Sequence, residues 1–398
     1  MSKIKKIYLD LCMCSIFHSM LEEPLLIHFA DYSNAKLLDK KIRAYSAMVA
    51  EIYSHGGSLT DEVRRLVFKN ENVYIKSCAS RKSVSDEILL ALDRELSVIE
   101  ELASLTPEDF MKDMSLDYVS PFSHYRTNLL EDYAERVKNI NRYGFGDFSL
   151  AIMMHVDDDG KILPIYYPDK ISIDHFIGYD DERQRVLSNT FAFLEGHPAQ
   201  NVLLCGDAGT GKSSTVKAVV NHFSDRGLRL IELRKDQLTL LPEIMYRISE
   251  NPLKFIIFID DLSFSKSDDS FNMLKATLEG SASAMADNAL IYATSNRRHI
   301  VKESFEDREG SDIHRNDSVQ EKLSLSERFG LVVYFGQPSK QLYLKIVIEL
   351  AERNKVDIDK NTLEMRAEEF ALRRGNRSAR CAEQFIKSLI QGKNNAYT

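Results

Sequence analysis

The feature that most constrains this chain is the run Gly-Asp-Ala-Gly-Thr-Gly-Lys-Ser at residues 206–213, which fits the P-loop pattern G-x-x-x-x-G-K-[ST] at every fixed position. The apolar run at 201–205 predicts a buried strand before it, and residues 213–223 predict a helix after it. A glycine-rich turn between strand and helix lets successive backbone N–H groups surround a phosphate chain, and the helix N-terminus adds partial positive charge. The pattern therefore predicts binding of a nucleoside triphosphate.

Two side chains of this loop have separate expected roles. Lys212 is expected to reach the β- and γ-phosphates, and the Ser213 hydroxyl is expected to ligate Mg²⁺. The expected phosphate-binding residues are Gly206, Asp207, Ala208, Gly209, Thr210, Gly211, Lys212, Ser213 and Ser214.

From residue 172 onward, predicted helices and strands alternate, which is typical of a parallel sheet covered on both faces. The further strands are expected at 228–233, 255–259, 289–295 and 331–335, with helices at 240–249 and 271–279. Residues 302–322 are strongly charged and aperiodic, and they predict a mobile surface insertion. After Pro338, the sequence predicts three helices separated near 354–357 and 374–377.

Polar residues close two of these strands. Asp260 and Asp261 follow the strand at 255–259, and carboxylates at the carboxyl edge of a parallel sheet face the crevice where ligands bind. Asp260 is expected to help hold Mg²⁺, and Asp261 to polarise the attacking water. Asn296 ends the strand at 289–295, where a neutral amide would position the γ-phosphate and the water.

Two arginines are candidates for stabilising the charge that develops during phosphoryl transfer. Arg328 lies just before the last strand, and Arg380 lies near the start of the final helix. For either residue taken alone, a solvated surface position is the commoner outcome.

Residues 1 to about 142 are predicted to be mostly helical, with apolar residues at helical spacing over 85–105 and a helix start at Thr106. These apolar stripes favour the packed core of a helical domain over a partner-binding groove. Residues 148–156 and 161–165, joined by a glycine-containing turn, predict a β-hairpin that leads into a linker.

Composition narrows the class of protein. The net charge of −8 argues against bulk electrostatic binding of nucleic acid, although a local basic patch would still allow it. The 5 scattered cysteines lack a C-x-x-C pair and the 10 histidines lack metal-ligand spacing, so the sequence predicts neither a disulfide framework nor a zinc site. Residues 1–17 favour an amphipathic first helix over a signal peptide, and no segment reaches membrane-spanning length. Cytoplasmic localisation is expected.

With these residues assembled, the chain resembles the AAA+ ATPases. In that family's pattern, residues 206–213 are the P-loop, Asp260 and Asp261 are the Walker B acids and Asn296 is the first sensor. Many of these ATPases carry Glu at the second acidic position; Asp is one methylene shorter, so slow activity is expected.

The resemblance also suggests roles for residues outside the P-loop and the acids. Arg328, in Ser-Glu-Arg-Phe-Gly, is similar to the arginine finger that is offered to a neighbouring subunit's ATP. Arg380 matches the second sensor of the helical lid, with Arg377 as a competitor for that role. Ile177 and Gly178 resemble the segment that contacts adenine through backbone and apolar groups.

The Asp-Asp pair and the Arg-Phe-Gly run are most similar to the initiator and helicase-loader branch typified by DnaA and DnaC. Over about 172–390, several runs also resemble a bacterial AAA+ family catalogued only as a domain of unknown function. Those runs are G-T-G-K-S-S-T-V-K-A (209–218), G-L-R-L-I-E (227–232), D-D-L-S-F (260–264), I-Y-A-T-S-N-R-R-H (291–299) and L-S-E-R-F-G (325–330).

The fold class expected from the pattern and the resemblance is α/β. It comprises a P-loop AAA+ module with a parallel sheet flanked by helices and a C-terminal helical lid, preceded by a mostly helical N-terminal domain and a β-hairpin. The expected boundaries are 1–145 for the helical domain, 146–171 for the hairpin and linker, 172–336 for the nucleotide-binding domain and 337–398 for the lid.

The leading functional hypothesis is a Mg²⁺-dependent ATPase that binds ATP and ADP and assembles as a homo-oligomer, in a ring or an open assembly. The N-terminal region is expected to engage a protein partner, and no membrane partner is expected. The alternative is an ATP-gated switch or loader module that binds protein or DNA, in which slow hydrolysis only resets affinity. A third reading, a helical scaffold with a degenerate ATPase, is disfavoured by the complete set of phosphate, metal and sensor residues.

Overall fold

The computed structural model describes residues 1–262, 269–278, 286–296 and 328–394, so the insertion expected at 302–322 lies outside the described residues. The chain divides into two compact units. One unit comprises Met1–Ala151 together with Glu250–Leu253, and the other comprises Ile152–Ser249 together with Lys254–Thr398. The two are called the N-terminal unit and the sheet unit below.

The N-terminal unit is helical in its described residues, as expected, and the amphipathic first helix is confirmed with Ile4, Ile7 and Leu11 buried. Its α-helices are α1 (Lys3–Leu11), α2 (Pro24–Asn34), α3 (Leu38–Ser54), α4 (Leu59–Lys69), α5 (Val73–Ala79), α6 (Asp86–Ala103), α7 (Pro107–Met114), α8 (Leu129–Lys138) and α9 (Ile140–Tyr143). Two 3₁₀ helices, η1 (His18–Glu22) and η2 (Gly146–Ser149), complete it.

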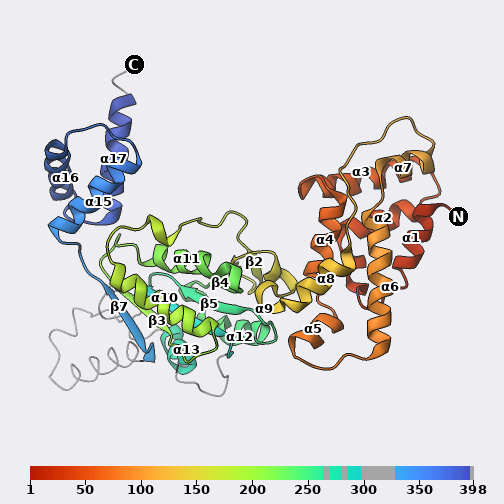
Figure 1. Ribbon diagram of the computed structural model, residues 1–398, viewed down its shortest axis with the longest axis horizontal. Helices are drawn as coiled ribbons and strands as arrows, with labels where there is room; N and C mark the ends of the chain where they lie inside the picture. Colours follow the sequence, from red (N-terminus) through yellow and green to blue (C-terminus); the bar gives the residue numbers. More distant parts are fainter. Residues whose placement is uncertain (263–268, 279–285, 297–327, 395–398) are drawn as a thin grey trace. The chain divides into compact units, whose positions relative to one another are not determined.

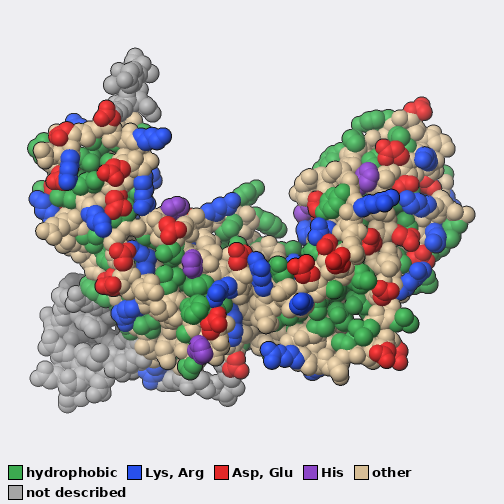
Figure 2. Space-filling view, in the orientation of Figure 1, with side chains coloured by type: hydrophobic (Ala, Val, Ile, Leu, Met, Phe, Trp, Pro, Cys, Tyr) green, Lys and Arg blue, Asp and Glu red, His purple; other side chains and the backbone are tan. Residues whose placement is uncertain are grey.

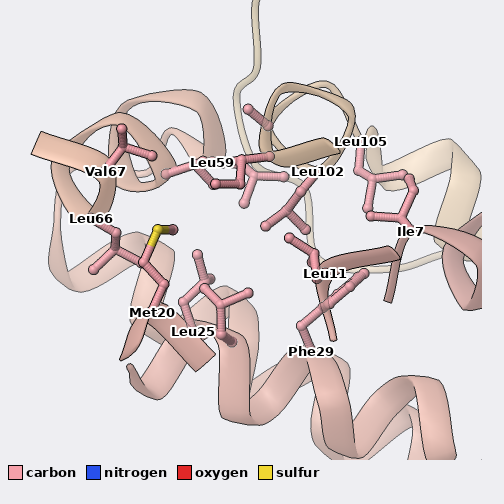
Figure 3. Packing of buried hydrophobic residues seen from close by; sticks show 14 of the residues in the cluster. Ile7, Leu11, Met20, Leu25, Phe29, Leu59, Leu66, Val67, Leu102 and Leu105 are labelled. Atoms are coloured by element: carbon pink, nitrogen blue, oxygen red, sulfur yellow. The ribbon is translucent and has the colours of Figure 1, made fainter. Parts of the chain in front are cut away.

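One apolar core holds this unit together, and its residues come from helices far apart in sequence. Figure 3 shows Met20, Leu25 and Phe29 facing Leu59 and Leu102 across that core. The stripe predicted over 85–105 supplies its buried face from α6, which favours the packed-core interpretation over a groove. Burial of this apolar surface is the main force that stabilises the unit.

The sheet unit is built on a seven-stranded sheet in the order β2-β1-β4-β5-β6-β3-β7. Every neighbouring pair is parallel except β1 and β2. The strands are β1 (Met153–Val156), β2 (Ile162–Pro164), β3 (Val202–Gly206), β4 (Leu228–Glu232), β5 (Lys254–Ile259), β6 (Ala289–Ser295) and β7 (Leu331–Phe335). β3 and β6 are buried along their whole length, as expected for strands covered on both faces.

The hairpin differs from the sequence expectation in two ways. Its first strand begins at Met153, because residues 146–149 form η2, in which the Ser149 hydroxyl donates to the Gly146 carbonyl at 2.8 Å. The apolar run 148–156 looks continuous in sequence but serves two units, since the boundary falls after Ala151. The hairpin is also part of the main sheet: β1 pairs in parallel with β4, with Met154 opposite Ile231.

Helices connect and cover the parallel strands, as parallel connections require. The helical elements of the sheet unit are η3 (Ile173–His175), α10 (Asp180–Leu194), α11 (Lys212–Phe223), η4 (Ser224–Arg226), η5 (Lys235–Leu240), α12 (Leu241–Ser249), α13 (Asp269–Leu278), α15 (Lys340–Arg353), α16 (Lys360–Arg374) and α17 (Ala379–Asn394). α10 and α11 share one core cluster with β3, β4, β5 and β6. The last three helices follow β7 and share a core cluster of their own, which confirms the three helices expected after Pro338 (Figure 1).

The fold class expected from the sequence is therefore confirmed. On the face shown in Figure 2, basic and acidic side chains are interspersed over each unit. Among the described helices, none combines the length and the apolar character needed to cross a membrane.

Candidate functional site

The phosphate-loop motif connects β3 to α11, as predicted. Gly206 ends β3 with φ of 137°, and a Cβ atom there would lie 2.0 Å from the Phe335 carbonyl oxygen of β7. Only glycine permits this backbone conformation and this approach of two strands. α11 begins at Lys212, directly after Gly211 with φ of 93°. The loop therefore presents main-chain N–H groups at a helix N-terminus, an arrangement suited to an anion.

Lys212 is buried and held inside the loop. Its Nζ donates to the carbonyls of Gly206 at 2.9 Å and Asp207 at 2.7 Å, and to Oδ1 of Asn296 at 3.0 Å. Burial lowers the pKa of Lys212, while the charge of Asp207 opposes that effect. An ammonium group has three donors, and all three are used. A phosphate chain would replace weak carbonyl partners with anionic oxygens.

The predicted acids lie at the carboxyl edge of the sheet beside the loop. Asp260 follows β5, and its Oδ1 accepts a 2.6 Å hydrogen bond from the Ser213 hydroxyl and another from the Thr294 hydroxyl. The Asp261 N–H donates to Thr294 Oγ1 at 2.9 Å. The two residues predicted to hold a metal, Ser213 and Asp260, are therefore in direct contact.

Asp261 adopts a left-handed backbone conformation with φ of 52°. This conformation is uncommon for a residue other than glycine, and such strain concentrates at functional sites. Asn296 follows β6 and donates from Nδ2 to Asp261 Oδ1 at 2.7 Å. A chain of hydrogen bonds thus runs from Lys212 through Asn296 to Asp261.

These residues line one cavity of about 530 Å³. Its opposite wall comes from η3 and the segment after it, from α10 and from the lid helices α15 and α17. Predicted residues on the wall are Ile177, Ala208, Gly209, Thr210, Gly211, Lys212, Ser213, Ser214, Asp260, Asp261, Asn296 and Arg380. Gly178 is not part of the wall but packs on α15, where a Cβ atom would lie 2.3 Å from Leu342 Cδ1. Gly206 and Asp207 are not among the residues that line the cavity, but their carbonyls accept hydrogen bonds from Lys212.

The structure places the two competing lid arginines differently. Arg380 lies on the cavity wall, and its backbone N–H donates to the Gly209 carbonyl at 3.3 Å. Arg377 makes a bidentate ion pair with Glu368 of α16 at 3.0 and 2.9 Å. Arg328 is half-buried just before β7 and is not among the residues that line the cavity.

Sequence reasoning missed part of the site. Thr294 bridges the two acids, because its hydroxyl donates to Asp260 and accepts from the Asp261 N–H. The sequence feature that could have indicated this role is a hydroxyl side chain near the end of a mostly apolar strand that pairs with the P-loop strand. Other wall residues carry no motif: His175, Phe176, Arg183, Ile346, Leu350, Ala379 and Glu383. Tyr179 also lies on the wall, within the run 177–180 that resembles the adenine-contacting segment.

A second group of metal-ligating side-chain types lies in the N-terminal unit, although the histidine spacing in the sequence did not indicate one. Glu51, His55 and Glu62 lie together, with His55 Nδ1 3.4 Å from Glu62. Arg65 already binds both oxygens of the buried Glu62 carboxylate, at 2.8 and 2.7 Å. The group is therefore satisfied as an ion-pair cluster, and we assign it no metal.

Comparison with protein families matches residues 149–393 to the family described as "Protein of unknown function (DUF815)". A search of curated proteins finds no match. Three solved chains of Thermotoga maritima RuvB, one titled the Holliday junction branch migration motor, are 14, 15 and 16% identical to this chain. They cover 56, 55 and 55% of this chain and 73, 71 and 71% of their own, each with a TM-score of 0.33. Likeness at that level supports no inference about activity.

Proposed function

This chain belongs to the DUF815 family, and on that premise we propose that it is a Mg²⁺-dependent ATPase that binds and hydrolyses ATP in the cavity between the phosphate loop, the sheet edge and the lid. The observation that carries the proposal is the 2.6 Å hydrogen bond between Ser213 and Asp260, beside the buried Lys212. A cation, a hydroxyl and a carboxylate on one wall are the groups that a metal-bound triphosphate needs.

The donor set fits a magnesium ion. Ser213, Asp260 and Thr294 offer hard oxygen atoms, which Mg²⁺ prefers. When bound, the ion would neutralise charge on the β- and γ-phosphate oxygens. Ser213 and Asp260 would hold it.

The remaining polar residues act on the phosphates and the water. Lys212 would leave the carbonyls of the loop for phosphate oxygens, since an ammonium binds an anionic oxygen more strongly than it binds a neutral carbonyl. Asp261 would accept a proton from the attacking water or orient it, and Asn296 would hold that water against the γ-phosphate. Arg380, from the lid, would stabilise charge on the transferring group.

The proposal of an oligomer rests on the position of Arg328. It does not line the cavity of its own chain, which supports a role in a neighbouring copy's site. We therefore propose a homo-oligomer in which Arg328 acts across the subunit interface, and an N-terminal unit that engages a protein partner. The mixed charges on the face seen in Figure 2 give no support to nucleic acid as that partner.

A second candidate is a slow ATP-gated switch, in which hydrolysis only resets affinity for a target. The Asn296–Asp261 hydrogen bond favours it, because it occupies an oxygen that would otherwise face the water. A steady-state rate measured with and without single-stranded DNA, at stated salt, separates the two. A rate that rises severalfold with DNA supports the switch.

The proposal is tested by the melting temperature with and without Mg·ATP. At ATP near 100 Kd, the wild type should gain about 2.7 kcal/mol, or about 5–10 °C in Tm. Lys212→Met should lose that gain, whereas Lys217→Met, on the same helix but off the cavity wall, should keep it. No shift in the wild type would overturn the proposal.

A further inference from the structure

The feature that carries this inference is Arg183 of α10, a cation with a buried side chain. Its side chain is only 4% exposed, yet it lies on the cavity wall. Among the described residues, it is the one arginine on that wall besides Arg380, and none of the roles given above uses it. Removing a guanidinium from water costs free energy unless its N–H groups find partners.

The partners that the described residues give Arg183 are few. Its Nη2 donates to Asp180 Oδ1 at 3.3 Å, and the side chain of Asp180 is 83% exposed. Its guanidinium also lies 4.7 Å from the centre of the Phe176 ring. Burial lowers the pKa of Arg183, which marks incomplete compensation. Of five N–H donors, one has a hydrogen-bond acceptor among the described residues.

Apolar side chains line the same cavity as Arg183. They are Phe176, Ile177, and Ile346 and Leu350 of α15. Flat, apolar surfaces with a single polar group are typical of a pocket for a heterocycle. A guanidinium can only donate, so the matching ligand atom must be an acceptor.

We infer that Arg183 is a specificity-determining residue that donates a hydrogen bond to a ring nitrogen of a purine base, and so selects purine over pyrimidine nucleotides. Ring nitrogens of purines are acceptors that a guanidinium reads in other settings. The inference rests on the proposed function, because it requires a nucleotide in this cavity.

A purely structural role would look different. If Arg183 only stacked on Phe176, its loss would weaken the binding of every nucleotide equally or destabilise the fold. A direct contact instead couples the side chain to one atom of the ligand, and a double-mutant cycle measures that coupling.

The experiment measures Kd by calorimetry for ATP, for 1-deaza-, 3-deaza- and 7-deaza-ATP, and for CTP. One deaza analogue should bind the wild type about 10-fold or more weaker than ATP does, since a hydrogen bond to a charged group contributes that much. The same analogue should equal ATP in Arg183→Met. Arg185→Met, on the same helix but exposed and bonded to the Val332 carbonyl, should behave as the wild type.

The possible outcomes distinguish a failure of the Arg183 contact from a failure of the proposed nucleotide binding. If the wild type binds no nucleotide, the proposed function fails. If it binds ATP but treats all analogues and CTP alike, or if the discrimination persists in Arg183→Met, only the role of Arg183 is overturned. Should Arg183→Met fail to fold, Arg183→Leu, which also lacks a donor, and the wild-type analogue series decide: equal binding of ATP and every analogue by the wild type, or an undiminished analogue penalty in Arg183→Leu, counts against the contact.

Discussion

Asn296 donates a 2.7 Å hydrogen bond to Asp261, so the amide at the end of β6 holds the acid that follows β5. Its Oδ1 simultaneously accepts from Lys212 at 3.0 Å. The side chains assigned to phosphate and to water are thus connected before any ligand enters. If phosphate oxygens take the Lys212 donors, as we propose, this connection would break at Lys212, and Asp261 would respond to the presence of phosphate.

Asp261→Asn should reduce hydrolysis by about 10²-fold or more while ATP affinity stays within about threefold. The reason is that an amide cannot accept the proton that a carboxylate accepts. Steady-state phosphate release and calorimetric Kd values check this expectation. Asp287→Asn, at an exposed position off the cavity wall, is the control. Full turnover in Asp261→Asn would remove Asp261 from the mechanism.

Arg328→Ala should retain nucleotide affinity and lose turnover by about 10³-fold, because an arginine supplied by a neighbour stabilises only the transition state. The specific activity of the wild type should also rise with protein concentration. An equal specific activity in dilute monomer and in concentrated protein would refute action across subunits.

Substitution of Arg377 and of Arg380 should affect different measured quantities: the pH dependence of Tm for Arg377, and the rate of turnover for Arg380. The Arg377 guanidinium holds the pKa of Glu368 below its usual value, so this ion pair stabilises the fold above the unfolded pKa and is lost as pH falls through the folded pKa. Arg377→Met should therefore lower Tm at pH 7, and the difference from the wild type should shrink below about pH 4.5.

Arg380→Met, by contrast, should lower turnover without changing this acid-side profile, because Arg380 lies on the cavity wall. Tm measured from pH 3 to 8 and the rate of phosphate release check the pair. The reverse pattern, with turnover lost only in Arg377→Met, would give the lid role to Arg377.

Gly206→Ala should destabilise the sheet unit by about 3 kcal/mol or more, since the left-handed conformation and a contact 2.0 Å from Phe335 both oppose a Cβ atom. Gly196→Ala shares a positive φ of 76° but has open space, so it should cost about 1–2 kcal/mol. Urea denaturation measures both. Equal losses would mean that crowding at Phe335 is relieved by a shift of β7.

The parts of the site that the sequence predicted are those written in contiguous motifs. The P-loop, the Asp260–Asp261 pair and Asn296 each follow a buried strand, and parallel strands bring their carboxyl ends to one edge. The role of Thr294 could not be predicted, because it depends on the register of β5 against β6, in which Ile259 lies opposite Ala293. Register between distant strands is not legible in local sequence.

Arg183 escaped for a different reason. On α10 it occupies a position that sequence periodicity treats as an ordinary charged site, and only tertiary packing buries it. The start of β1 was mispredicted because an unbroken apolar run, 148–156, divides its side chains between two units. Periodicity reports that residues are apolar but not which core receives them.

The contact between Arg380 and Gly209 is made by main-chain atoms, the N–H of one and the carbonyl of the other. Replacement of the Arg380 side chain leaves this contact in place unless the new residue is proline. A side chain at position 209 would disturb it, because φ there is 78° and an added Cβ atom would lie 3.1 Å from Arg380 Cβ. For every residue at 380 other than proline, this hydrogen bond joins the final helix to the phosphate loop. If the last three helices move when nucleotide binds, the bond would pass that motion to the loop backbone, and a change of the side chain at 380 would not remove it.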